Sequence, residues 1–130
     1  MIKTVPRQHI HENFKLMAEN APVMIWIADT EKNRYYFNKA WLDFRGKTLE
    51  EECGDGWLAG IHPEDLRRSV HIFEEAFSKR IAYKKEFRLL RKDGTYRWIL
   101  TLGAPILNDT LFEGYIGSCM DINYRVEQEQ

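Results

Sequence analysis

The chain has 130 residues, of which 44% are hydrophobic and 30% charged, and its formal net charge is -1 at pH 7. This length suits one hydrophobic core rather than two domains, and the balanced charge gives no overall attraction to nucleic acid or to an anionic membrane. The longest apolar run, residues 21–28, is interrupted by Pro22 and falls short of the roughly 18 residues that indicate a membrane span. We therefore expect one domain with no nucleic-acid binding and no direct membrane contact.

Two cysteines, Cys53 and Cys119, lie far apart in a chain of ordinary apolar content, so no disulfide scaffold is indicated. The first residues also lack the apolar core of a secretory signal. A cytoplasmic setting is the expectation, and it includes the cytoplasmic part of a membrane-tethered receptor.

The first elements that the sequence predicts are a helix and a buried strand. Ile10, Phe14 and Met17 recur at helical spacing among polar residues, which indicates an amphipathic helix after a flexible segment over residues 1–9. Residues 23–28 are apolar at every position, so alternation cannot select one buried face. A strand covered on both sides is the natural interpretation.

A second strand passes directly into a helix. The aromatic run 34–37 predicts the strand, and Asn38 is suited to cap a helix that stops at Gly46. Proline and two acidic residues within 62–65 then begin the longest helix, predicted over about residues 64–79.

Three strand-like runs follow over about residues 82–91, 95–106 and 112–121, rich in aromatic and β-branched residues. Asp93-Gly94 is the strongest hairpin signal, because a two-residue primed turn needs a positive φ that glycine tolerates. Asn108-Asp109 marks the second turn. Strands joined by tight turns are antiparallel, so the pattern predicts an α+β fold with the helices segregated to one side of a sheet.

Four motifs in this order resemble the PAS family, in the branch whose C-terminal half carries the PAC motif. They are Asn38 after the second strand, His62 to Asp65 before the long helix, Arg91 to Trp98 across the hairpin, and Gly114 to Gly117 leading to Asp121-Ile122-Asn123. The resemblance covers residues 10–123, which leaves 124–130 as the start of an exit helix or a linker. It implies a five-stranded antiparallel sheet in the order 2-1-5-4-3, with helices on one face and an N-terminal amphipathic helix.

The resemblance implies a sensory module and not an enzyme. Family members are attached to histidine kinases, diguanylate cyclases and phosphodiesterases, transcription regulators or chemoreceptors, and this sequence carries no phosphate loop, phosphoacceptor segment or cyclase motif. We expect a bacterial signal-relay module. Its expected partners are a second copy of the domain and an effector domain or partner protein, such as a two-component histidine kinase. Its mechanism would be a population shift of the flanking helices.

By resemblance, the inner face of the sheet and the helices above it form a pocket. It would hold a small metabolite, or none if ordinary core side chains fill it, and Trp26 argues against a large cofactor because its indole can occupy that volume. Tyr36, Thr101 and Tyr115 are expected to converge there as polar groups. The residues implied are Met24, Trp26, Ala28, Tyr36, Trp41, Leu58, Val70, Phe73, Phe77, Phe87, Leu89, Ile99, Thr101, Tyr115, Gly117 and Cys119.

Haem and flavin are not expected, although a haem- or flavin-binding sensor is the alternative, as is a pure dimerisation module. Family flavin photochemistry needs a reactive cysteine in a characteristic segment, whereas Cys53 follows three acidic residues that would raise its pKa. Haem sensing in the family uses a histidine on the long helix. His71 is about one residue from the position that the resemblance favours, so we expect it to face solvent or to pack against another helix. No cluster with metal-ligand spacing and no nucleophile with a base is found in the sequence.

Basic residues gather around the predicted hairpin. Glu86 and Asp93 interleave with them, which favours a solvated face over a nucleic-acid site. The basic residues are Lys84, Lys85, Arg88, Arg91, Lys92 and Arg97.

The opposite face of the predicted sheet is also apolar and requires a cover. The N-terminal helix is the expected cover, and a second copy of the domain would cover the remainder. The residues expected to form this relay and dimer face are Ile10, Phe14, Met17, Ile25, Ile27, Leu100, Leu102, Ile116, Met120 and Asp121.

Overall fold

The computed structural model describes residues 17–19 and 21–129. Its elements are β1 (Met24–Ala28), β2 (Arg34–Phe37), α2 (Lys39–Arg45), α3 (Leu49–Glu52), the 3-10 helix η1 (Gly56–Gly60), α4 (Pro63–Lys79), β3 (Tyr83–Leu90), β4 (Tyr96–Asn108), β5 (Leu111–Asp121) and α5 (Asn123–Glu129). The predictions for residues 1–9, Ile10 and Phe14 lie outside the described residues. Within the described part of the chain, no helix has the length and apolar character needed to cross a membrane.

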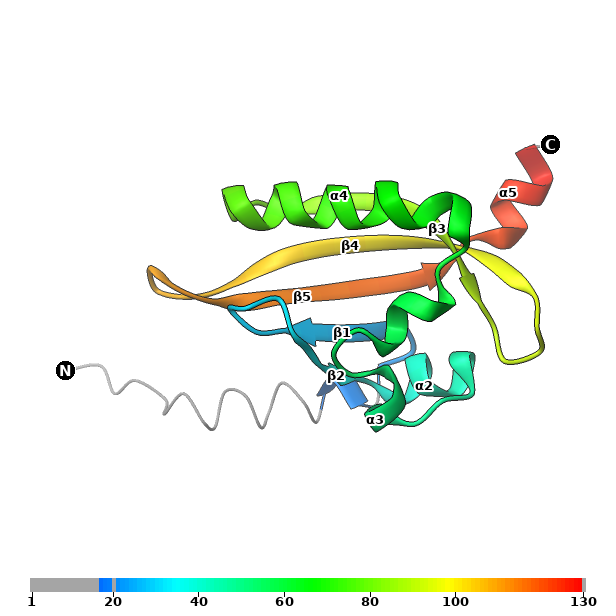
Figure 1. Cartoon of the computed structure of the whole chain (residues 1–130), viewed down its shortest axis with the longest axis horizontal. Helices are drawn as coiled ribbons and strands as arrows, with labels where there is room; N and C mark the ends of the chain where they lie inside the picture. Colours follow the sequence, from blue (N-terminus) through cyan, green and yellow to red (C-terminus); the bar gives the residue numbers. More distant parts are fainter. Residues whose placement is uncertain (1–16, 20, 130) are drawn as a thin grey trace.

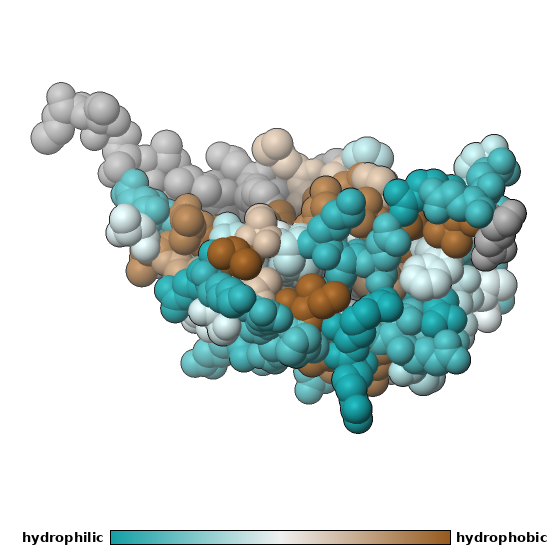
Figure 2. All heavy atoms as spheres, turned by 90° about the horizontal axis from the view of Figure 1, so that it is seen from above, coloured by the Kyte–Doolittle hydropathy of each residue, from teal (hydrophilic) through white to brown (hydrophobic). Residues whose placement is uncertain are grey.

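The five strands form one antiparallel sheet in the order β2-β1-β5-β4-β3, which confirms the predicted fold class and topology. In Figure 1, α4 runs along the sheet beside β3 and β4, α2 and α3 lie near β1 and β2, and α5 leaves from the end of β5. Seen from above, the surface is largely hydrophilic, with separate hydrophobic groups between the charged side chains (Figure 2).

Local capping signals place the helix ends as expected. Asn38 Oδ1 accepts a hydrogen bond from the backbone N–H of Trp41 at 3.1 Å, and Gly46 ends α2 with a φ of 67°. Pro63 occupies the first turn of α4, where its missing N–H has no helical partner to lose. These boundaries depend on neighbouring residues alone, which is why the sequence predicts them well.

The β3–β4 hairpin differs from its prediction. Leu90 pairs with Tyr96, so the connection spans five residues, and only Gly94 of the predicted pair has a positive φ, 85°. The Asp93 carboxylate closes the loop by accepting hydrogen bonds from the Thr95 backbone N–H at 3.1 Å and hydroxyl at 2.7 Å. The predicted two-residue turn at this position is therefore wrong, because a side-chain bridge replaces it.

The main core lies between the inner face of the sheet and α2, η1 and α4. Trp26 stands at its centre, 1% exposed, with Phe73 edge-on to it at a ring-centroid distance of 5.9 Å. Alternation along each strand selects the inward side chains. The buried members are Met24, Trp26, Ala28, Phe37, Trp41, Trp57, Ile61, Phe73, Phe87, Leu89, Ile99, Phe112, Tyr115 and Cys119.

Candidate functional site

A cluster of polar side chains lies inside this apolar core, and we call it the core polar cluster: Arg34 on β2, Ser69 on α4, and Tyr83 and Lys85 on β3. Arg34 is 3% exposed, and its guanidinium lies between the Trp26 and Trp57 rings, with Cζ 3.6 Å from each ring centroid. Stacking on two indoles gives cation–π stabilisation and covers both faces of the guanidinium. Only its edge is left for hydrogen bonding.

Lys85 is the second basic side chain of the cluster. It is 5% exposed, and its Nζ donates a hydrogen bond to the Ser69 backbone oxygen at 3.1 Å. Burial, with a smaller contribution from Arg34, lowers the pKa of Lys85 to about 7. Burial also lowers the pKa of Arg34 to about 10, so the guanidinium is still a cation at neutral pH.

Three buried polar atoms of the core polar cluster have no hydrogen-bond partner among the described residues: Arg34 Nη2, Ser69 Oγ and Tyr83 Oη. The Tyr83 phenol nevertheless lies close to the Arg34 guanidinium, because the charge of Arg34 and a weak hydrogen bond from it oppose the rise that burial causes in the pKa of Tyr83. Their geometry falls short of a well-formed hydrogen bond. Buried polar groups normally have partners. The cluster therefore has unused hydrogen-bonding capacity in a dry setting.

Beside the cluster, Thr101 on β4 and Cys119 on β5 contact each other, with Oγ1 3.2 Å from Sγ. Both are fully buried, and burial raises the pKa of the Cys119 thiol. A protonated thiol at this position is a small core side chain with little nucleophilic reactivity.

Most of the predicted pocket residues do face the main core. Tyr115 does so as well, but its Oη lies 2.8 Å from the carbonyl oxygens of Ala76 and Ile81, so its hydroxyl ties the end of α4 to the sheet. The predicted residues that lie in the main core, or pack against it, are Met24, Trp26, Ala28, Trp41, Leu58, Phe73, Phe77, Phe87, Leu89, Ile99, Tyr115 and Cys119.

Tyr36 is a wrong prediction, because it lies on the outer face of the sheet. It packs with Ile27 and Ala18, and its Oη donates to Glu19 Oε2 at 2.6 Å. The register shifts between Ile27 and Ala28, and this irregularity interrupts the alternation along β2. Phe37 takes the inward position that the sequence assigns to Tyr36.

Val70 is also wrongly placed. The inward stripe of α4 consists of Asp65, Ser69, Phe73 and Ala76, and two of these are polar. Val70 is half-buried and lines a surface groove with neighbouring residues of the helix. Choosing only apolar residues therefore selects Val70, although the polar Ser69 is the residue that faces the core in this turn of α4.

Sequence reasoning missed all four residues of the core polar cluster. Lys85 stands at period two with Phe87 and Leu89, so strict alternation indicates its inward direction, whereas its grouping with exposed basic residues is wrong. Three arginines of the hairpin do pair with carboxylates: Arg88 with the buried Asp65 at 2.8 Å, and, nearer the surface, Arg91 with Asp93 at 2.7 Å and Arg97 with Asp121 at 2.8 Å.

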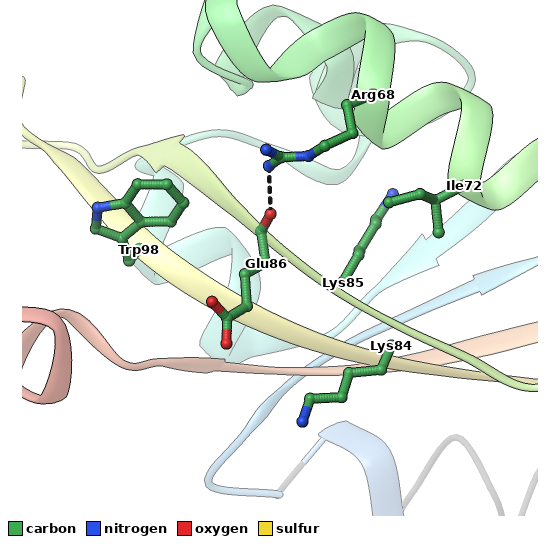
Figure 3. Close-up of a pocket in the computed structure, with 6 residues that line it drawn as sticks. All are labelled: Arg68, Ile72, Lys84, Lys85, Glu86 and Trp98. Atoms are coloured by element: carbon green, nitrogen blue, oxygen red, sulfur yellow. Dashed lines mark hydrogen bonds between the residues drawn. The ribbon is translucent and has the colours of Figure 1, made fainter.

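An open groove of about 490 Å³ adjoins the core polar cluster between α4 and β3. Figure 3 shows Lys84 and Lys85 leaving β3 in opposite directions, Lys85 toward α4, and Arg68 donating to the backbone oxygen of Glu86. The lining residues are Arg68, Ile72, Lys84, Lys85, Glu86 and Trp98. Lys85 thus belongs to both the groove and the buried cluster.

The residues considered for cofactor chemistry lie elsewhere. Cys53 is half-buried, and burial together with Glu52 raises the pKa of its thiol. His71 is exposed, with Nε2 3.4 Å from Glu75. Over residues 17–19 and 21–129, no three His, Cys, Asp or Glu side chains are grouped so that they could hold a metal ion.

The outer face of the sheet carries a small second cluster formed by Ala18, Ile27 and Tyr36, with Ile25 and Ile106 packed against it. Met17 is 74% exposed, so the prediction that it covers this face is wrong. Ala18, the next residue, provides the contact instead. Leu100 and Ile116 are half-buried, while Leu102 and Met120 remain exposed on neighbouring strands.

Polar contacts connect the sheet to α5. Asp121 pairs with Arg97 and accepts a hydrogen bond from the Asn123 backbone N–H at 2.8 Å. Asn123 Oδ1 accepts from the Trp98 backbone N–H at 3.0 Å, and Arg125 pairs with Glu86 at 2.6 Å. The start of α5 is therefore fixed to β3 and β4, next to the groove.

The chain resembles known proteins both in sequence and in structure. A family model described as PAS fold matches residues 34–114. The chain belongs to the PAS fold family. This PAS domain is 36% identical over 118 residues to an uncharacterised protein of Sinorhizobium fredii, covering 90% of the chain and 14% of that protein.

Two further relatives show where such domains occur. The peroxide stress-activated histidine kinase mak1 of Schizosaccharomyces pombe is 27% identical over 122 residues, covering 85% of this chain and 7% of that protein. The solved PAS domain of a Colwellia psychrerythraea protein has a TM-score of 0.73 and 22% identity, covering 89% of this chain and 99% of that one. This PAS domain therefore spans only a small part of the two curated relatives.

Proposed function

We propose that this PAS domain is a non-catalytic sensory module that binds a small ligand in its core and relays the event through the sheet and α5. The core polar cluster carries this proposal. Ser69 Oγ is buried without a partner, and Arg34 Nη2 and Tyr83 Oη have only the weak contact between the Arg34 guanidinium and the Tyr83 phenol. Leaving a buried polar group unsatisfied costs about 1–3 kcal/mol. A ligand that accepts these hydrogen bonds would recover part of that free energy.

The relay follows from the position of the cluster. Lys85 lies on β3 beside Glu86, which pairs with Arg125 of α5, and Trp98 of β4 is hydrogen bonded to Asn123. A ligand that favours one position of β3 would therefore favour one position of α5, which is a population shift. The histidine kinase relative supports an output through an effector domain or partner protein.

A second candidate function is dimerisation and relay without a ligand. The dense packing of Trp26, Trp57 and Phe73 around Arg34 favours it, because stacking already stabilises the cation. For both candidate functions we propose that the domain forms a homodimer through the outer face of the sheet and that it is located in the cytoplasm. We also propose that it binds neither haem nor flavin.

Native mass spectrometry and an absorption spectrum of freshly purified protein test the proposal. We expect an added mass that is released on denaturation, no haem or flavin band, and slower amide hydrogen exchange over residues 123–129 when the released molecule is added back. A clean apoprotein mass, with no small molecule from a cell extract changing either melting or exchange, would favour the ligand-free function.

A further inference from the structure

We propose that the core polar cluster binds a small organic carboxylate, held by the edge of the Arg34 guanidinium and by Lys85. This inference rests on the proposed function, since it names the chemical class of the ligand for the same cluster.

The first argument is charge. Other buried ions of this domain are paired: Arg45 Nε lies 2.7 Å from Glu52 Oε1, and Asp65 receives Arg88. Arg34 and Lys85 are equally buried, but no carboxylate is among the groups whose charge shifts the pKa of either one. Arg34 and the protonated form of Lys85 repel each other, so an anion placed between them stabilises both charges and favours protonation of Lys85.

The second argument is the direction of the hydrogen bonds. Arg and Lys side chains only donate, and the Ser69 and Tyr83 hydroxyls each have a donor without an acceptor. A site with several converging donors and positive charge suits an acceptor with two oxygens and a negative charge. Since the indoles cover both guanidinium faces, the carboxylate would meet Arg34 edge-on, which is the usual geometry of this pair.

The third argument is the surroundings. Trp26, Trp57 and Phe73 surround Arg34 with aromatic surface. The Tyr83 and Phe87 rings lie beside Lys85. Aromatic surface suits the apolar body of an organic acid better than a hydrated inorganic ion. The groove in Figure 3 offers a route, because Arg68, Lys84 and Lys85 line it and the lining acid Glu86 is already paired with Arg125. A positively charged groove concentrates anions near its opening.

The test titrates the 130-residue protein with sodium benzoate, acetate and succinate at pH 7 in a buffer of low anion content, followed by calorimetry and thermal melting. Benzamide is the neutral match to benzoate, and sodium chloride controls for ionic strength. We expect saturable binding and a higher melting temperature with at least one carboxylate, and no such response to benzamide or chloride.

Paired variants locate the site. Lys85→Met keeps an unbranched side chain, one heavy atom shorter, and removes its charge, whereas Lys84→Met makes the same change on the exposed neighbour. Losing a hydrogen bond to a charged group should weaken carboxylate binding about tenfold or more in Lys85→Met, and less than about twofold in Lys84→Met. Arg34→Met should act like Lys85→Met, and Lys85→Met remains informative if Arg34→Met does not fold.

Three outcomes would overturn the inference: equal responses to benzoate and benzamide, equal losses in Lys84→Met and Lys85→Met, or no saturable binding of any carboxylate tested. The native mass separates this failure from failure of the proposed function. A neutral molecule recovered from the core would leave the sensory function standing and refute only the carboxylate.

Discussion

Single residues in this domain bury charge in two different ways. Glu52 is 1% exposed and accepts hydrogen bonds from Arg45 Nε at 2.7 Å and Trp41 Nε1 at 2.9 Å, so its charge is fully matched. The Arg34 and Lys85 cations have no such match. The Arg45–Glu52 pair holds α2 and α3 together and against the core. Arg34 and Lys85 instead remain able to bind an anion.

Removing the matched carboxylate should destabilise the domain strongly. Glu52→Ala leaves Arg45 buried without its partner, and we expect a loss of about 3–5 kcal/mol in the free energy of unfolding. Urea denaturation measures it, with Glu50→Ala as the control on the exposed side of the same helix, where a change within about 0.5 kcal/mol is expected. Similar losses in the two variants would contradict a specific role for the buried pair.

Lys85 should make stability depend on pH. Its pKa is about 7 in the folded protein and 10.5 as the ordinary value, so between these values the unfolded chain binds more protons and stability rises with pH. Below pH 7 both states are protonated, and the full cost of burying the cation is present. The slope can reach about 1.4 kcal/mol per pH unit.

Urea denaturation at intervals from about pH 6.5 to 7.5, in a buffer of low anion content, measures this slope mostly below the range in which the thiols of the unfolded chain ionise. The rise should be present in the unaltered protein and in Lys84→Met, and should be flat in Lys85→Met. An unchanged slope in Lys85→Met would show that another group titrates.

At the scale of elements, the sequence predicts most of the fold because its signals are local. Alternation, Asn38 and Pro63 place the strands and helices within one or two residues of their observed ends. The errors arise where two elements meet. Tyr36 pairs with Ile27 and shares its outward direction, and the register shift between Ile27 and Ala28 then pairs Arg34 with the inward Ala28. No pattern within β2 itself reports which neighbour it pairs with or where the register shifts.

Asn38 connects three elements through one amide. Its Oδ1 accepts from the backbone N–H groups of Ile25 and Trp41, and its Nδ2 donates at 2.8 Å to the carbonyl oxygens of Ala18 and Val23. Asn38→Ala should therefore cost more than an ordinary helix cap, about 2–4 kcal/mol of unfolding free energy.

The control for this variant is Asn33→Ala, an exposed asparagine in the turn before β2, for which a change within about 0.5 kcal/mol is expected. Thermal or urea unfolding compares the two. A cost for Asn38→Ala near 1 kcal/mol would mean that only the helix cap matters.

At the scale of the molecule, one sheet has two different uses. Its inner face and the helices enclose the core polar cluster, while its outer face keeps apolar side chains in solvent. Leu102 and Met120 are 49% and 45% exposed there, and β4 and β5 place them on neighbouring strands. The sequence predicts the apolar character of this face from alternation, but it cannot report what covers the face, because that depends on other segments or copies.

If a second copy covers this face, charges placed on it should separate the dimer without unfolding the domain. We expect Leu102→Lys with Met120→Lys to weaken dimerisation at least about tenfold, because two buried apolar contacts are replaced by cations facing their own copies. The free energy of unfolding of the monomer should change by less than about 1 kcal/mol, since both side chains are already half exposed. Sedimentation velocity over a concentration series measures the dimer.

The matched control is Leu107→Lys with Leu111→Lys. These two leucines are equally apolar and are 57% and 55% exposed, but they lie at the β4–β5 turn. A monomeric parent protein, or equal weakening by the turn variants, would refute this face as the dimer interface, because only a contact centred on the outer face of the sheet distinguishes the two pairs.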